Sequence, residues 1–222
     1  MVHDELVSAG VHIGLKEQTK DMKRFVYKIR NDGLAVFDLQ NIAKRIEIAG
    51  KFLSKFNSIM VVSRKAVAHK AIRKFAEAVG AQAITGRFLP GTITNPSFRG
   101  YREPEVVVVT DPLADKQAMK EAMNMRLPII SLCDTFNETG SVDLVIPCNN
   151  MGRKAVGMVY FSLAKEIMKT KGQDASSLKL EEFFVPEERQ ERMERTDRPE
   201  RRDRMGRGGR SERPQRRMPG RR

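Results

Sequence analysis

Three aspartates each follow an apolar run typical of a β-strand. Asp38 ends "LAVFD", Asp111 follows "EVVVVT" and Asp134 follows "IISLC". In open α/β sheets, the carboxyl ends of the parallel strands form the edge where ligands and catalytic groups lie. Carboxylates that meet at this edge could hold Mg²⁺, because this ion prefers oxygen ligands. The pattern therefore raises one hypothesis, a metal-dependent phosphotransfer or hydrolase domain.

A structural role is the alternative for the same aspartates. An Asp after a strand often accepts hydrogen bonds from the first N–H groups of the next helix, and "TDPLAD" places Asp111 or Asp115 at such a cap. The sequence has neither of the glycine-rich phosphate loops, GxGxxG or GxxxxGK[ST], and no recognisable nucleophile elbow. We therefore predict that the chain is not an enzyme and uses no cofactor and no small-molecule substrate.

The histidines and cysteines lack the spacing of a metal site. They are His3, His12, His69, Cys133 and Cys148. We predict that the chain binds no metal. Each cysteine lies at the end of an apolar, strand-like run, which predicts buried, reduced thiols in a cytosolic protein, with a disulfide as the weaker alternative.

The elements that would position these residues alternate between strand and helix. Val106–Val109 is typical of a strand buried on both faces of a parallel sheet. Strands are expected at 34–39, 58–63, from 82, at 105–109, 128–133 and 143–147, and helices at 41–56, 64–80, 115–125 and 152–169. Ser63 is expected to cap the second helix and Gly80 to end it. The alternation predicts an α/β fold, a doubly wound, mostly parallel sheet with helices on both faces.

The charge of the chain indicates a polyanionic partner. The net charge is +13 and the isoelectric point is about 10.0. A protein this basic commonly neutralises nucleic acid, and an anionic membrane surface is the rival. No apolar run reaches the roughly 18 residues that span a bilayer, and the N-terminus has no secretory signal pattern. We therefore expect a cytoplasmic protein with no membrane partner.

The composition changes sharply near Pro186. Residues 187–222 contain 14 arginines, 8 acidic residues and no Leu, Ile, Val or Phe. Such a segment cannot bury enough apolar surface to offset its ordering entropy. We predict a folded domain over 1–186, which includes a basic N-terminal arm, and a disordered, basic, Arg-rich tail over 187–222. Within the tail, Arg207 and Arg210 of "RGRGGR" are candidates for loose RNA binding.

Three basic surfaces in the domain are candidates for RNA binding. The basic arm (residues 16–30) interleaves Phe25 and Tyr27 with cations, which are Lys16, Lys20, Lys23, Arg24, Lys28 and Arg30. The helix stripe consists of Lys70, Arg73 and Lys74. The loop patch consists of Arg87, Arg99 and Arg102 in an aromatic, Gly- and Pro-rich segment. Such residues suit phosphate contact with stacking on unpaired bases, although a single patch is also consistent with a solvated face.

Six motifs in order resemble the small-subunit ribosomal protein S2 family in its archaeal and eukaryotic form, the branch that includes the laminin-receptor precursor. They are "AGVHIG" (9–14), "DMKRFVYKIRNDGLAVFDL" (21–39), "GRFLPGTITNP" (86–96), "REPEVVVVTDP" (102–112), "LPIISLCDT" (127–135) and "VDLVIPCNNMGRKAVG" (142–157). The direct passage from helix to strand over 36–63 leaves no room for the helical hairpin of bacterial members. This departure favours the archaeal side of the family.

The resemblance implies a flavodoxin-like domain without catalytic activity. It also implies a structural constituent of the small ribosomal subunit, a ribonucleoprotein, that supports subunit assembly and translation. The expected partners are small-subunit rRNA and neighbouring small-subunit ribosomal proteins. The three aspartates are then expected to be capping and turn residues on an enzyme-like scaffold.

Overall fold

The computed structural model describes residues 2–173 and 178–184, and the predicted tail over 187–222 lies outside the described residues. The helices are α1 (Val2–Ser8), α2 (Leu39–Leu53), α3 (His69–Val79), α4 (Lys116–Asn124) and α5 (Arg153–Thr170). The strands are β1 (Val26–Ile29), β2 (Ala35–Phe37), β3 (Ile59–Ser63), β4 (Gln82–Thr85), β5 (Val106–Val109), β6 (Ile129–Cys133) and β7 (Leu144–Pro147). Short 3₁₀ turns occur at η1 (Lys23–Phe25), η2 (Ala66–Ala68) and η4 (Leu180–Glu182).

A five-stranded parallel sheet organises the domain. Its strand order is β4-β3-β5-β6-β7, and every neighbouring pair in it is parallel. Numbered from β3, this order is 2-1-3-4-5, the flavodoxin-like arrangement in which the chain reverses direction across the sheet between the first and third strands. The predicted doubly wound α/β fold is therefore confirmed.

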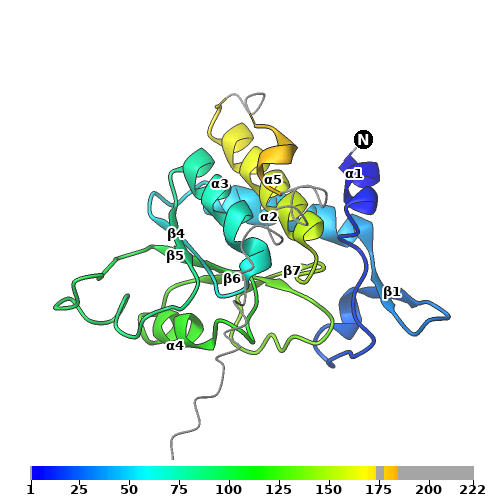
Figure 1. The fold of residues 1–222 in the computed structure, drawn as a ribbon, viewed down its shortest axis with the longest axis horizontal. Helices are drawn as coiled ribbons and strands as arrows, with labels where there is room; N and C mark the ends of the chain where they lie inside the picture. The colour runs from blue at the N-terminus through cyan, green and yellow to red at the C-terminus, as the bar shows by residue number, and fades with distance from the viewer. Residues whose placement is uncertain (1, 174–177, 185–222) are drawn as a thin grey trace, which may run out of the picture. The chain divides into compact units, whose positions relative to one another are not determined.

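Helices cover both faces of the sheet. Helices α2, α3 and α5 pack together on one face, and α4 lies on the other (Figure 1). Alternate residues of the strands point to the two faces, so that Ile59 and Val61 join the core beneath α2, α3 and α5, whereas Met60 and Val62 join the core beneath α4. The valines of β5 are buried in the same alternating way, as their uninterrupted apolar run predicts.

Two expectations about single elements need correction. Strand β2 does not join the main sheet, because a short turn, rather than a helical crossover, precedes it, and it pairs antiparallel with β1 as a separate hairpin. Helix α3 begins at His69 after the η2 turn, so Ser63 does not cap it and instead accepts a hydrogen bond from the N–H of Lys65. Gly80 ends α3 in the left-handed conformation, as predicted.

Helices α2 and α5 approach each other closely at Gly50. A Cβ built at Gly50 would lie 2.7 Å from Cβ of Glu166 on α5, closer than two such carbons approach in folded proteins. A side chain at this position therefore forces the two helices apart. Overpacking of this kind costs about 1–3 kcal/mol.

We expect Gly50→Ala to lower the free energy of unfolding of the full-length protein by up to about 2 kcal/mol, because the helix-propensity gain of Ala, about 1 kcal/mol, offsets part of the strain. Urea unfolding followed by circular dichroism measures the change. Gly140→Ala is the matched control, since a Cβ there meets no atom within 4 Å. A Gly50→Ala protein as stable as the Gly140→Ala protein would contradict this packing.

Candidate functional site

A buried ion pair lies at the carboxyl ends of the central strands. Nζ of Lys65, just after β3, is 2.7 Å from Oδ2 of Asp111, just after β5, and the two side chains are 16% and 3% exposed. Asp111 also accepts a hydrogen bond from the N–H of Leu113, two residues on, at 3.0 Å. The carboxylate is therefore paired and oriented rather than open toward a ligand.

Two asparagines connect this ion pair to the neighbouring strands. Nδ2 of Asn137, after β6, donates to Asp111 Oδ1 at 2.8 Å, and Oδ1 of Asn137 accepts from the N–H of Asp134 at 2.7 Å. Asn150, after β7, accepts from Nζ of Lys65 at 2.9 Å and donates to Asn137 at 3.0 Å. One hydrogen-bonded network thus joins the ends of β3, β5, β6 and β7.

The N-terminal segment packs over the same edge of the sheet. The N–H of Leu15 donates to Oγ1 of Thr135 at 3.0 Å, and the Thr19 hydroxyl donates to the carbonyl of Asn137 at 2.8 Å. A Cβ at Gly14 would lie 2.5 Å from Cγ2 of Thr135, so only glycine permits this approach. The N-terminal segment therefore covers the residues that follow β6, next to the polar network.

The three strand-end aspartates do not converge. Asp38 is the N-cap of α2 and accepts from the N–H of Gln40 at 3.0 Å. Asp134 accepts from the N–H of Thr135 at 2.7 Å. No group of three His, Cys, Asp or Glu side chains that could hold a metal occurs among the residues that the structure describes. The prediction that these aspartates serve as caps and turns is confirmed for Asp38, and Asp111 holds a turn and an ion pair.

Asp115 departs from its predicted role as a helix cap. It occupies the N-cap position of α4, but its side chain makes no capping bond and accepts from the N–H of Arg64 at 2.8 Å. Burial, together with the nearby Asp111 carboxylate, raises its pKa to about 6. Asp115 thus links the turn after β3 to the start of α4 and is only partly ionised near pH 6.

The two cysteines are unpaired and buried, as predicted. Burial raises the pKa of Cys133 to about 12 and that of Cys148 well above its ordinary value. Neither thiol forms a thiolate near neutral pH, so neither has the activation that a nucleophile or a metal ligand requires.

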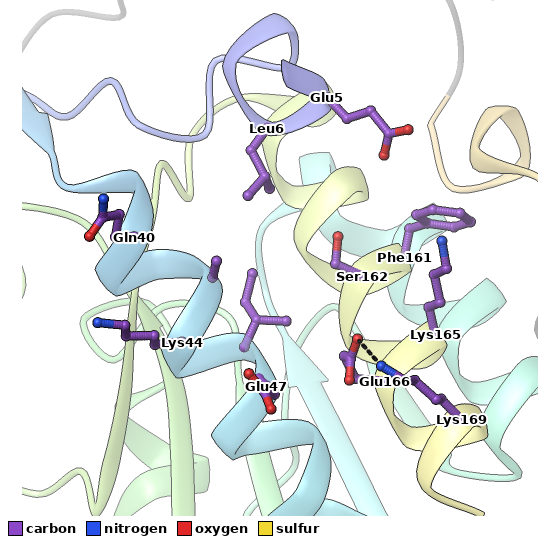
Figure 2. Close-up of a pocket in the computed structure, with 12 residues that line it drawn as sticks. Glu5, Leu6, Gln40, Lys44, Glu47, Phe161, Ser162, Lys165, Glu166 and Lys169 are labelled. Carbon is purple, nitrogen blue, oxygen red and sulfur yellow. Dashed lines mark ion pairs between the residues drawn. The ribbon is translucent and has the colours of Figure 1, made fainter. Parts of the chain in front are cut away.

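A hollow between α1, α2 and α5 has mixed charge (Figure 2). Leu6 and Ile46 are among its apolar lining residues. Three acids and three lysines surround them, namely Glu5, Glu47, Glu166, Lys44, Lys165 and Lys169. Because no single sign dominates, the hollow lacks the field that would concentrate a phosphate or a metal ion.

All six cations of the basic arm are exposed. Arg30 pairs with Asp32 at 3.3 Å, whereas Lys16, Lys20, Lys23 and Lys28 form no ion pair with another described residue. Tyr27 on β1 is 73% exposed. The structure therefore leaves cations and an aromatic ring accessible on the β1–β2 hairpin and on the segment that precedes it.

The loop patch lies on the connection that leaves edge strand β4. Arg87, Arg99 and Arg102 are exposed. Buried Glu121 of α4 anchors this loop, since its carboxylate accepts from the N–H groups of Gly91 at 2.8 Å and Ile93 at 3.2 Å. Burial opposes its ionisation, but hydrogen bonds from Gln117 and from the loop backbone hold the pKa of Glu121 below its usual value. The arginines thus lie on a loop whose backbone is held in place at Gly91 and Ile93.

The helix stripe is less available for binding. Lys74 is half-buried and lies 2.8 Å from Glu77 and 3.7 Å from Glu182. Arg73 donates to Oγ1 of Thr85 at 3.2 Å, and Lys70 donates to the carbonyl of Phe184 at 3.4 Å. Arg207 and Arg210 lie outside the described residues.

Sequence reasoning missed two features of the surface and the site. It assigned no structural role to Lys65, because the sequence does not show that this lysine faces Asp111 across the sheet. It also missed the exposed cations around α4, namely Lys116, Lys120 and Arg126, because their spacing on a short helix resembles an ordinary solvated face.

Comparisons with known proteins give one consistent family. Residues 6–99 and 97–170 match the family model described as "Ribosomal protein S2". The chain is 50% identical over 171 residues to "Small ribosomal subunit protein uS2" of Thermoplasma acidophilum, a match that covers 76% of this chain and 86% of the relative. The protein of the same name from Thermoplasma volcanium is 50% identical, over 76% of this chain and 86% of its own length. The one from Haloquadratum walsbyi is 48% identical, over 81% of this chain and 65% of its own length.

We expect Lys65→Met to destabilise the protein by about 3–5 kcal/mol, because it leaves Asp111 charged, buried and without its cation. The free energy of urea unfolding measures the loss. Adding Asp111→Asn should recover part of it, since the uncompensated charge is then removed. Lys70→Met, at an exposed position, is the control and should change stability by less than about 0.5 kcal/mol. Equal stability of the Lys65 and Lys70 variants would contradict a structural ion pair.

Asp115 should make stability depend on pH. Its folded pKa of about 6 lies above its ordinary value of 3.8, so the folded protein binds this proton more tightly than the unfolded chain. The free energy of unfolding should therefore fall as pH rises from about 4 to about 6, by up to about 3 kcal/mol. Asp115→Asn keeps an acceptor for the Arg64 N–H but does not titrate. The free energy of unfolding of this variant should therefore fall less steeply over the same pH range. Parallel pH profiles from urea unfolding would show that Asp115 is not responsible.

Proposed function

The chain belongs to the ribosomal protein S2 family, and from this premise we propose that it is a non-enzymatic, structural constituent of the small ribosomal subunit in the cytoplasm. The observation that carries the proposal is about 50% identity to proteins named small ribosomal subunit protein uS2, over three quarters or more of this chain. The matched residues include all five strands of the parallel sheet and the polar network at their carboxyl ends.

The proposed ligand is small-subunit rRNA. Support comes from the net charge of +13 and from exposed cations that remain free of acidic partners within the described part of the chain. Lysine and arginine at phosphates release counterions and supply affinity that is independent of base sequence. Such contacts position a protein on RNA, which suits a structural role in subunit assembly and translation.

We assign the main phosphate contacts to the basic arm and the loop patch. Lys16, Lys20, Lys23 and Lys28 make no ion pair with a described residue, and Tyr27 beside them offers a face on which an unpaired base can stack. Arg87 and Arg99 likewise make no ion pair with a described residue. Arg24, Arg30 and Arg102 form contacts that an RNA phosphate could replace, at 4.8 Å over the Phe25 ring, 3.3 Å to Asp32 and 3.5 Å to Gln82.

The helix stripe and the tail arginines are secondary candidates. Lys70, Arg73 and Lys74 already bond to described neighbours, so RNA must displace those contacts before it binds. Arg207 and Arg210 remain a prediction from composition alone, and the family match ends at residue 170. Neighbouring small-subunit proteins are the second proposed class of partner. No helix among the described residues is long and apolar enough to cross a membrane.

We expect the wild-type protein to sediment with small ribosomal subunits in low salt and to be released in high salt, because phosphate contacts weaken as salt rises. Arg87→Ala with Arg99→Ala should weaken rebinding to salt-stripped subunits. It should also flatten the slope of log affinity against log salt by about one to two units, a little under one for each lost phosphate contact. Sucrose-gradient sedimentation and titration at several salt concentrations measure both effects.

Lys44→Ala with Lys165→Ala is the matched control, since these two exposed cations line the mixed-charge hollow of Figure 2. This control should keep the wild-type affinity and slope, and all three proteins should melt at nearly the same temperature. A wild-type protein that never sediments with small subunits would overturn the proposed function. Equal slopes for the two double variants would remove only the assignment to the loop patch.

A further inference from the structure

Helix α4 exposes a cluster of large apolar side chains. Leu113, Met123 and Met125 are 53%, 44% and 43% exposed. Leu113 lies in the turn that leads into α4, Met123 lies in its last turn, and Met125 directly follows it. Leu113 and Met123 line one hollow together, and contiguous exposed apolar surface often marks a binding site.

The cluster borders a groove between α4 and the segment that leads to β7. Two adjoining hollows share Met123, Gly140 and Ser141, so they form one depression along the helix. Met119 and Phe136 line one half, and Leu127 and Pro128 line the other. Apolar side chains therefore form part of the lining of this depression, which is open to solvent.

The α4 side of the groove is basic. Lys116 and Lys120, one helical turn apart, line it together with Arg126, and none of the three forms an ion pair with another described residue. Two acids also line the groove, Glu138 and Asp143, but the Asp143 carboxylate already accepts from the N–H of Ile129 at 2.8 Å. The cations that flank the apolar floor thus favour a partner with acidic side chains.

Arg126 holds an unfavourable backbone conformation at the end of this groove. Its φ of +54° is the one positive value at a non-glycine residue in the described part of the chain. It ends α4 where glycine is the usual residue, since the N–H of Leu127 donates to the carbonyl of Ala122 at 2.9 Å. Strained residues of this kind cluster at functional sites, where a specific side chain outweighs the conformational cost.

We propose that this groove binds an acidic segment of a neighbouring small-subunit protein, one that inserts apolar side chains between α4 and residues 138–143. Methionine suits such a surface because its flexible thioether adapts to the shape of the inserted group. The cations of this groove could also meet phosphate, but the exposed Leu113 and Met123 side chains offer RNA neither a ring for base stacking nor a donor for phosphate, and a protein segment can bury them. The inference rests on the proposed function, because the small subunit supplies the partner.

Photo-crosslinking within reconstituted subunits identifies the occupant. Full-length protein with p-benzoylphenylalanine at Met123 is bound to salt-stripped small subunits and irradiated. We expect an adduct with a ribosomal protein, at a segment that carries both acidic and apolar residues. The same probe at Ile48, which is 52% exposed on α2, is the control and should not give that adduct. An adduct with rRNA alone, or no adduct at Met123, would overturn the proposal.

Substitution within the groove separates this contact from phosphate binding. Gly140→Phe fills the depression from a position where a Cβ meets no atom within 4 Å, and Leu113→Ser with Met123→Ser removes the apolar anchors. Each variant should bind stripped subunits at least 10-fold more weakly, with an unchanged salt slope and unchanged affinity for protein-free rRNA. Val7→Ser with Ile48→Ser, at exposed apolar positions elsewhere, is the matched control and should bind as the wild type does.

The outcomes distinguish the two proposals. Groove variants that melt at the wild-type temperature and rebind subunits as well as the wild type would overturn the groove while leaving the proposed function intact. An equal loss of affinity for protein-free rRNA would show that the surface binds RNA, which also overturns the protein partner. If the wild-type protein itself fails to bind stripped subunits, the proposed function falls and this inference falls with it.

Discussion

The buried pair of Lys65 and Asp111 constrains the whole carboxyl edge of the sheet. Two charges removed from water are tolerated only when they meet each other and when their remaining hydrogen-bonding groups are satisfied. Asn137 and Asn150 meet this requirement from two further strands, so four strand ends must keep their relative positions. The N-terminal segment then packs on the network through Thr135, and the approach at Gly14 leaves no space between them. A local electrostatic requirement thus sets the arrangement of loops far apart in the sequence.

This arrangement occupies part of the edge where related architectures do chemistry. A flavodoxin-like sheet offers a crevice where the strand order reverses, which here lies between β3 and β5, but Lys65 and Asp111 form an ion pair across the ends of these two strands. Accessible charge lies instead on the basic arm and on the loop after β4. The scaffold is the same as that of many enzymes, yet the cations of the basic arm and the loop patch are exposed, which suits contact with an extended polyanion better than enclosure of a small substrate.

The sequence predicts the parts of this fold that depend on local periodicity. Four consecutive valines indicate a doubly covered strand, and the apolar stripes of α2 and α3 indicate their buried faces. It fails where a residue's partner is remote. The apolar run before Asp38 resembles the other strands, but a short turn makes it antiparallel to β1 and outside the sheet. Asp115 occupies a cap position and yet bonds to Arg64, because burial between two turns determines its partner. No local pattern reveals Lys65 as the counter-ion of Asp111, since 46 residues separate them in the chain.

Charged contacts and apolar contacts on the surface have different roles, and neither can replace the other. Phosphate contacts supply affinity at almost any site on a large RNA, since the backbone repeats the same charge at regular spacing. A protein that must occupy one position on a subunit therefore needs contacts whose energy depends on shape. The groove along α4 is proposed for this role, because it has apolar side chains in its lining, a basic border and an arginine with positive φ at its end. Charge on the basic arm and the loop patch can bring the protein to the subunit. The groove can hold the protein in one orientation, because an apolar side chain of the partner inserts only where the partner and the groove face each other.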